Sequence, residues 1–237
     1  MPMHNAARSL LEIAHPLTGS GTDYDPLLRL AADTHVVLIG EASHGTHEFY
    51  LERARITRRL IQEFGFNAVA VEGDWPDAYR VNRFVRGQSG DTTAEAALGD
   101  FRRFPQWMWR NADVLDFIGW LREANDALPA AAQKTGFYGL DLYSLHASIE
   151  AVVTYLDRVD PLAAARARRR YGCFDHFGGT QEYGYAAGLG LSASCELEVL
   201  EQLVDFRRHA AIYATRNGGI PRDEWFYASE NARLVKD

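Results

Sequence analysis

The stretch HVVLIGEASHGTHEFYLERARITRRLIQEFGFNAVAVEG (His35–Gly73) holds two short apolar runs separated by a long amphipathic segment. The runs His35–Glu41 and Asn67–Gly73 are rich in β-branched residues, as buried parallel strands are. The segment between them has Thr46 as a helix cap and Gly65 as a stop, so it predicts a helix. Strand, helix and strand in this order predict a βαβ unit.

Strands and helices alternate through the rest of the chain as well. Further helices are predicted over residues 75–87, 111–128 and 144–161, and a third strand over residues 135–142. Because helices that join parallel strands pack on the sheet, the predicted fold class is α/β, a parallel β-sheet with helices on both faces. The Gly-rich stretch 172–192 lacks the lysine of a phosphate loop and is predicted to be a plain loop.

The composition excludes several classes of protein. The chain has 237 residues, 47% of them apolar, and a net charge of −7. This length supports one substantial core or at most two small domains, and the acidic balance argues against a nucleic-acid partner. No run approaches the ~20 apolar residues of a membrane span, so no membrane partner is expected. Cys173 and Cys195 are the only cysteines. We therefore expect no disulfide framework, and a reducing cytoplasm fits.

Polar side chains gather at the predicted carboxyl ends of the strands. They are Glu41 and His44 after the first strand, Glu72 and Asp74 after the second, and Asp141 at the third. In open parallel sheets, ligands bind outside the carboxyl ends of the strands. These residues therefore predict a functional site at that edge.

Arg53 lies in the apolar stripe of the first predicted helix. That stripe has helical spacing and consists of Phe49, Ile56, Leu60 and Phe64. A guanidinium facing the sheet without a partner would be very costly, so Arg53 is predicted to pair with Glu41 or Glu72. The alternative is that Arg53 extends to solvent or only connects loops.

Glu41, His44 and His47 allow two kinds of chemistry. Their side chains are usable metal ligands, but Glu41 and His44 straddle a turn and a nearby arginine would repel a divalent cation. We therefore expect no metal and no cofactor. Alternatively, His44 is a general base, oriented by Glu41 three residues earlier. No Gly-x-Ser-x-Gly elbow is present, and Cys173 and His176 lack a third catalytic partner.

Several segments resemble one known family. The segment 39–87, which begins IGEASHGTHEF, strongly resembles the erythromycin esterase family, particularly its broad branch of uncharacterised bacterial homologues. FPQWMWRN (104–111) and the segment 136–177 resemble the same family. The resemblance implies a family domain over residues 23–237, preceded by an N-terminal helical segment over residues 1–22.

The resemblance also implies roles for individual residues. In macrolide-hydrolysing members, a histidine activates water to open a lactone ester without an obligatory metal, and that role carries over to His44. The accompanying polar residues map to Glu41, Arg53 and Glu72. Asp74, Asp141 and His47 are then expected to contact the substrate.

Two departures from the family pattern affect these expectations. HGTHEF and EGDWPDAYRVN belong to the homologue branch rather than to the antibiotic-resistance enzymes. A second active-site histidine, in a Trp-Ala-His-Asn-like segment of the longer family domains, has no counterpart here. We therefore expect an incomplete domain, with a poorly packed last helix from about Asp223 onward and an unpaired sheet edge.

The sequence thus predicts a hydrolase in which histidine-activated water attacks an ester or lactone of a small organic molecule. The predicted partner is this substrate alone, and the predicted location is cytoplasmic. Two alternatives remain, a non-catalytic small-ligand-binding domain and a metal-dependent hydrolase using Glu41, His44 and His47. The sequence does not indicate the oligomeric state.

Overall fold

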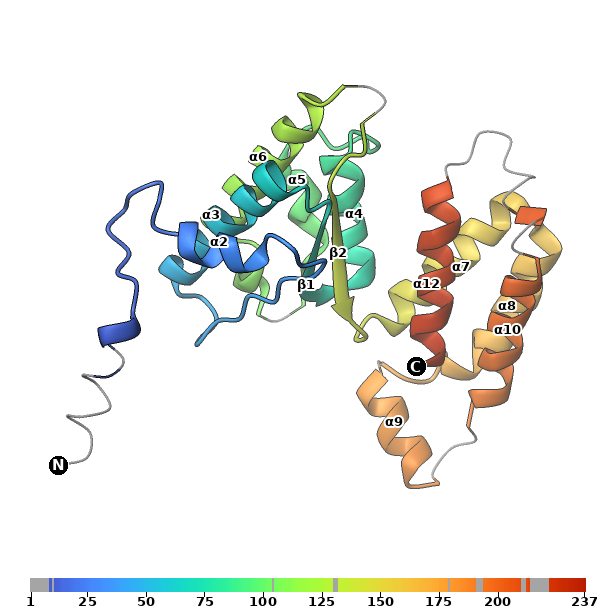
Figure 1. The fold of residues 1–237 in the computed structure, drawn as a ribbon. Coiled ribbons are helices and arrows are strands. Elements are labelled where there is room, and N and C mark those ends of the chain that lie inside the picture. The colour runs from blue at the N-terminus through green and yellow to red at the C-terminus, as the bar shows by residue number, and fades with distance from the viewer. Residues whose placement is uncertain are drawn as a thin grey trace. The chain divides into compact units, whose positions relative to one another are not determined.

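The chain divides into two compact units, Met1–Asn67 and Ala68–Asp237, in a computed structural model (Figure 1). The structure describes residues 9, 11–103, 105–129, 132–178, 180–190, 194–209, 212–213 and 222–237. Of the predicted N-terminal helical segment, residues 11–13 are helical, whereas residues 1–8 and 10 lie outside the described residues. Each unit is described by itself.

The first unit is built on two helices, α2 (Asp25–Ala31) and α3 (His47–Phe64). As predicted, α3 begins after Thr46 and ends at Gly65, which has a φ of 72° in the left-handed region that glycine favours. Of its predicted apolar stripe, Ile56, Leu60 and Phe64 pack with residues of α2 in a small core. The extent of α3 thus agrees with both its apolar spacing and its glycine stop.

An ion-pair network reinforces the contact between the two helices. Arg59 Nη1 lies 2.7 Å from Asp25 Oδ1, and Arg59 Nε lies 2.6 Å from Glu63 Oε1. These hydrogen bonds raise the pKa of Arg59 and lower that of Glu63. The guanidinium therefore links the start of α2 to the end of α3.

The prediction of a first strand at His35–Glu41 is wrong, because residues 36–41 form no strand. Val37 and Ile39 pack against the core of the first unit, whereas Val36 and Leu38 are 70% and 92% exposed. The alternate residues of this segment therefore do differ in burial, as the apolar pattern predicted, because one side of the extended segment is covered and the other is exposed. A strand also requires a hydrogen-bonded neighbour, which local periodicity does not report.

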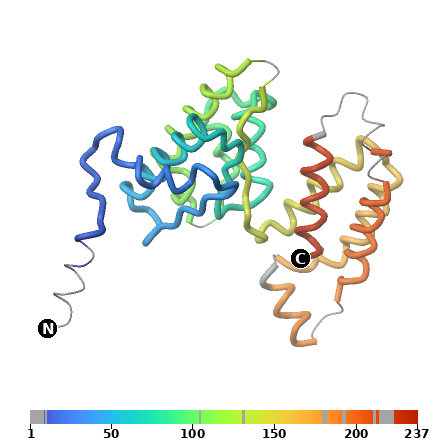
Figure 2. Tube along the Cα trace, viewed as in Figure 1, coloured from blue at the N-terminus to red at the C-terminus, as the bar shows by residue number. Residues whose placement is uncertain are grey.

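The second unit contains two strands and eight α-helices among its described residues, and Figure 2 traces its path. In order, these are β1 (Ala68–Asp74), α4 (Trp75–Val85), α5 (Ala94–Ala97), α6 (Ala112–Asp126), β2 (Gly136–Asp141), α7 (Leu145–Val159), α8 (Pro161–Tyr171), α9 (Thr180–Gly188), α10 (Glu196–Arg208) and α12 (Arg222–Lys236). Short 3-10 turns lie at residues 98–100, 106–108 and 172–174.

β1 and β2 form a parallel two-stranded sheet, with α4 packed beside it (Figure 1). A side chain at Gly139 would come within 2.3 Å of the Gly73 carbonyl oxygen, so only glycine permits this close pairing. The fold is therefore α/β, as predicted, but mostly helical. Helices on both faces are not found in the described part of this unit, because Ala68, Ala70 and Glu72 on one face of β1 are exposed.

Two buried asparagines attach β2 to the helices. Asn125 on α6 accepts a hydrogen bond from Thr135 N at 2.8 Å and donates to the carbonyl oxygens of Val85 and Thr135. Asn82 on α4 accepts from Phe137 N at 3.0 Å. These amides satisfy backbone groups that would otherwise be buried without a partner.

The last helix packs well, so the expectation of a poorly packed C-terminal helix is wrong. α12 lies against α7 and α10, and these helices share a core with α8. Ala228 and Ala232 are fully buried, and Val235 is 7% exposed. Small residues on one side of α12 allow close approach of its neighbours, and this core does not depend on the sheet.

The Gly-rich stretch 172–192 differs from the predicted loop, because it contains helix α9. Cys173 and Cys195 flank this helix and form a disulfide with a Cα–Cα distance of 6.0 Å. The expectation of no disulfide is therefore wrong, and the cysteine count no longer favours a reducing compartment. No described helix is long and apolar enough to cross a membrane.

The disulfide should contribute measurably to stability. It closes a loop of 22 residues, so Cys173→Ser with Cys195→Ser is expected to lower the free energy of unfolding by about 3 kcal/mol. Urea unfolding of the oxidised protein and the double variant measures this difference. Thiol titration of the denatured, unreduced wild type should find no free thiol, and two free thiols would contradict the pairing.

Candidate active site

Glu41 is the centre of a small polar cluster in the first unit. His44 Nδ1 contacts Glu41 Oε1, and Arg53 Nη2 lies 2.8 Å from Glu41 Oε2. The Glu41 side chain is 11% exposed, whereas His44 is 45% exposed. The predicted contact between Arg53 and Glu41 is therefore present, and the carboxylate connects a cation to an accessible imidazole.

The local chain path explains how these side chains meet. Gly45 has a φ of 79°, which lets the chain turn sharply between Glu41 and the start of α3. Arg53 lies two helical turns into α3, and its guanidinium also lies over the Tyr50 ring, 4.7 Å from the centroid. Burial raises the pKa of Tyr50. The ring and the carboxylate together hold the guanidinium in place.

This geometry suits proton transfer by His44. A carboxylate that contacts Nδ1 fixes that nitrogen as the donor and leaves Nε2 to accept a proton. His47 is the exposed first residue of α3. Among the residues that the structure describes, no group of three or more His, Cys, Asp or Glu side chains could hold a metal ion.

The other predicted site residues lie in the second unit, at the ends of its strands. Asp74 at the end of β1 and Asp141 at the end of β2 are paired in the register of the sheet, and Glu72 precedes Asp74 on β1. With Asp77 and Arg103 they line a recess of about 60 Å³. The structure thus groups Glu41, His44 and Arg53 in one unit and Glu72, Asp74 and Asp141 in the other.

The aspartates of this recess have raised pKa values. Burial raises the pKa of Asp74, and Arg103, with Nη1 3.7 Å from Asp74 Oδ2, partly offsets the effect. Burial also raises the pKa of Asp141, with contributions from Asp74 and Glu72. Such groups can hold or release protons closer to neutral pH than ordinary carboxyls can.

Asp77 has the largest perturbation in the recess and was missed by the sequence predictions. Burial, followed by the charges of Asp74 and Asp100, raises its pKa to about 7. The signal in the sequence was its position in the first turn of the helix after a strand end. Arg103 was also missed, because its segment has no helix or strand pattern to place it.

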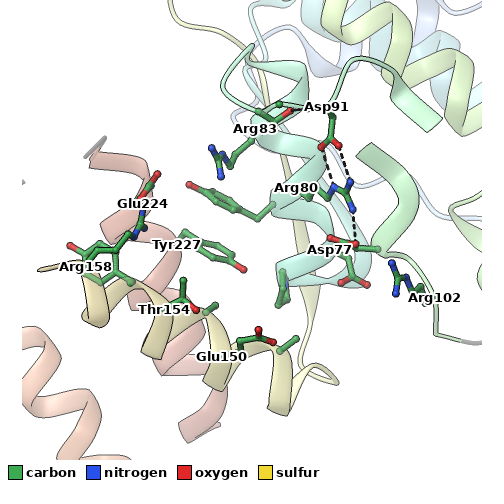
Figure 3. A pocket seen from close by; sticks show the side chains of 18 residues that line it. Asp77, Arg80, Arg83, Asp91, Arg102, Glu150, Thr154, Arg158, Glu224 and Tyr227 are labelled. Atoms are coloured by element: carbon green, nitrogen blue, oxygen red, sulfur yellow. Dashed lines mark hydrogen bonds and ion pairs between the residues drawn. The ribbon is translucent and has the colours of Figure 1, made fainter. Parts of the chain in front are cut away.

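Asp77 also borders a second, larger cavity (Figure 3). This cavity has a volume of about 910 Å³ and is lined by α4, α7, α12 and the segment 89–102. No other described residue lines both the recess and the cavity. Asp77 therefore borders both spaces.

Loss of Arg53 should destabilise the first unit. Arg53→Leu leaves the Glu41 carboxylate largely buried without its guanidinium, so the free energy of unfolding is expected to fall by about 2 kcal/mol. Arg55→Leu is the matched control, because Arg55 is 48% exposed in its pair with Glu52 and should cost about 0.5 kcal/mol or less. Urea unfolding measures both, and equal losses would contradict the role of Arg53.

Loss of the Asp77 carboxyl should stabilise the protein in a pH-dependent way. Because the pKa of folded Asp77 is about 7 instead of 3.8, wild-type stability falls as pH rises through this window. Asp77→Asn should therefore raise the urea midpoint at about pH 8 and change it little at about pH 4. Asp33→Asn, at an exposed position, is the control. A shift of Asp77→Asn that is the same at both pH values would exclude this explanation.

Comparisons with known proteins agree with the resemblance seen in the sequence. Erythromycin esterase type II of Escherichia coli is 32% identical over 120 residues, which make up 51% of this chain and 26% of that protein. A solved succinoglycan biosynthesis protein has a TM-score of 0.70 and 22% identity, covering 98% of this chain and 55% of its own. A solved erythromycin esterase mutant in its open conformation has a TM-score of 0.65 and 17% identity, covering 92% of this chain and 52% of its own.

These similarities differ in what they establish. At such low identities the solved structures show a shared fold alone. The chain spans about half the length of these two structures and 26% of the curated relative. The family profile described as erythromycin esterase matches residues 61–237, which is most of the chain. The chain therefore belongs to the erythromycin esterase family.

Proposed function

We propose that this protein is a hydrolase in which His44 activates a water molecule to cleave an ester or lactone of a small organic molecule. The observation that carries the proposal is the contact between His44 Nδ1 and Glu41, whose other oxygen contacts Arg53. Membership of the erythromycin esterase family supports hydrolysis of this kind.

The proposed reaction follows ordinary general-base chemistry. His44 Nε2 takes a proton from water while the oxygen attacks the carbonyl carbon, and Glu41 stabilises the imidazolium that forms. The tetrahedral intermediate then collapses, and the alkoxide leaves with the proton from the imidazolium. Arg53 is proposed to hold the substrate or the developing oxyanion, and Glu72 to hold the substrate.

The proposed substrate class rests on the relatives. A relative and a solved structure are named erythromycin esterases, so a macrolide lactone is one candidate substrate. Asp74, Asp141 and His47 are proposed to contact the substrate. Metal-dependent hydrolysis is less favoured, because the Glu41 carboxylate already contacts His44 and Arg53.

Replacement of the general base tests the proposal. In the full-length gene product, His44→Ala is expected to lower kcat for a lactone or alkyl ester by about 10²–10⁴. The circular dichroism spectrum should stay unchanged, because His44 is substantially exposed. Activity within a few-fold of the wild type would reject His44 as the base.

His47→Ala is the matched control, since it removes an exposed histidine three residues away. It should change kcat much less than His44→Ala does. Two results together would favour the metal-dependent alternative. They are an equal loss of kcat in both variants, and wild-type activity that is lost on chelation and restored by added Zn²⁺. No turnover of any ester by the wild type would favour a non-catalytic binding domain.

A further inference from the structure

We propose that the cavity lined by α4, α7 and α12 binds a polyhydroxylated ligand, either a saccharide or the glycosyl part of a larger molecule. Its volume of about 910 Å³ is within the range of sites that hold organic ligands. Figure 3 shows polar side chains from these helices directed into it. The inference goes beyond the proposed hydrolysis, because binding in this cavity requires no chemistry at His44.

Charges of both signs line the cavity in near balance. Its described lining includes five carboxylates and four guanidiniums. A compact anion would be repelled by the former and a compact cation by the latter, so neither ion is strongly favoured. A neutral ligand with many hydroxyl groups suits this mixture, because each hydroxyl can donate to a carboxylate and accept from a guanidinium.

Several of these charges already compensate one another and form a fixed rim. Arg80 pairs with Asp91 and Asp100 at 2.8 and 2.6 Å, and Arg158 pairs with Glu224 at 2.5 Å. Such pairs hold their donors and acceptors in defined orientations. The rim can therefore select a pattern of hydroxyl groups without rearrangement.

Other polar groups at the cavity are available to a ligand. Within the described part of the chain, Asp77 and Glu150 have no hydrogen-bond or ion-pair partner, and Figure 3 shows them facing the cavity from α4 and α7. Burial raises the pKa of Tyr227 on α12 to about 12; a hydrogen bond with the Asn231 side chain partly offsets this, and the charges of Asp77, Asp100 and Glu150 add to it. Its hydroxyl therefore stays protonated and can donate to a ligand.

The cavity also has an apolar wall. Ala147 and Ala151 of α7 line the cavity and supply this apolar surface. Tyr79 and Tyr227 also line it, but their ring faces are covered, because the two rings stack with centroids 3.8 Å apart and Tyr227 also stacks on Trp75. A pyranose ring has an apolar C–H face and polar hydroxyls around its edge. It can therefore lie against this wall while its hydroxyls reach Asp77 and Glu150.

A matched pair of probes tests this inference by isothermal titration calorimetry on the whole protein. The probes are 4-nitrophenyl β-D-glucopyranoside and the 4-nitrophenyl ether of tetrahydropyran, which has the same rings without the hydroxyls. The glucoside is expected to bind at least about tenfold more tightly, because the ether leaves the polar lining unpaired. Equal affinities, or no measurable binding of either probe, would overturn the proposal.

Variants locate the binding site and separate this inference from the proposed function. Asp77→Ala and Glu150→Ala should each weaken glucoside binding about fivefold or more, whereas Glu198→Ala, exposed on α10 and outside the cavity, should not. His44→Ala should lower kcat for ester turnover by about 10²–10⁴ and leave glucoside binding unchanged. The inference would also be overturned if the affinity for the glucoside were unchanged in both cavity variants, or if benzylammonium or benzoate bound more tightly than the glucoside.

Discussion

The position of the strand-end carboxyls depends on the buried amides that attach β2 to its helices. Asn82 and Asn125 are each 1% exposed, and their hydrogen bonds satisfy backbone groups at the start of β2. An unpaired backbone group at such a place would cost about 1–3 kcal/mol, so other alignments of β2 against α4 and α6 are disfavoured. With β2 held in this way, its register with β1 sets Asp141 opposite Asp74. The acidic recess is thus a consequence of packing at the opposite end of the strands.

Elements with strong local signals, including both strands of the sheet, were predictable from the sequence, whereas contacts between distant segments were not. The limits of α3 were predictable from Thr46 and Gly65, which lie within one turn of the helix ends. Gly65 ends the helix in the left-handed region, whereas Thr46 occupies the cap position without a capping hydrogen bond from its side chain. The segment His35–Glu41 has the apolar alternation of a strand, but pairing requires a neighbour that periodicity does not specify. The disulfide between Cys173 and Cys195 likewise depends on where α8 and α10 bring the two cysteines. Their number alone does not show whether they meet.

The same distinction applies to the candidate site. Glu41 and His44 are three residues apart across a turn, and Arg53 stands out in an apolar stripe, so their contacts could be inferred from spacing. Asp77 looked like an ordinary acidic residue in the first turn of a helix. Its perturbation arises from burial, from Asp74 at the N-cap of the same helix, and from Asp100, which a later segment brings near it. Electrostatic environment is a property of the assembled unit and so lies beyond a reading of sequence patterns.

Glu41 and Asp77 show two uses of a carboxyl group in one chain. Glu41 has a guanidinium 2.8 Å from one oxygen and an imidazole against the other, an arrangement suited to holding a neighbouring side chain in a fixed orientation. Burial and the like charges of Asp74 and Asp100 disfavour the charged form of Asp77, and within the described part of the chain no cation lies at hydrogen-bonding distance from it. Folding alone gives no reason to keep a carboxyl in that environment, since an amide there would carry no charge to desolvate. Residues of this kind are characteristic of binding and catalytic sites, where stability is lost for the sake of function. The position of Asp77 at the border of the recess and the larger cavity therefore favours the proposed contact with a ligand, whereas the contacts of Glu41 suit its proposed role in orienting His44.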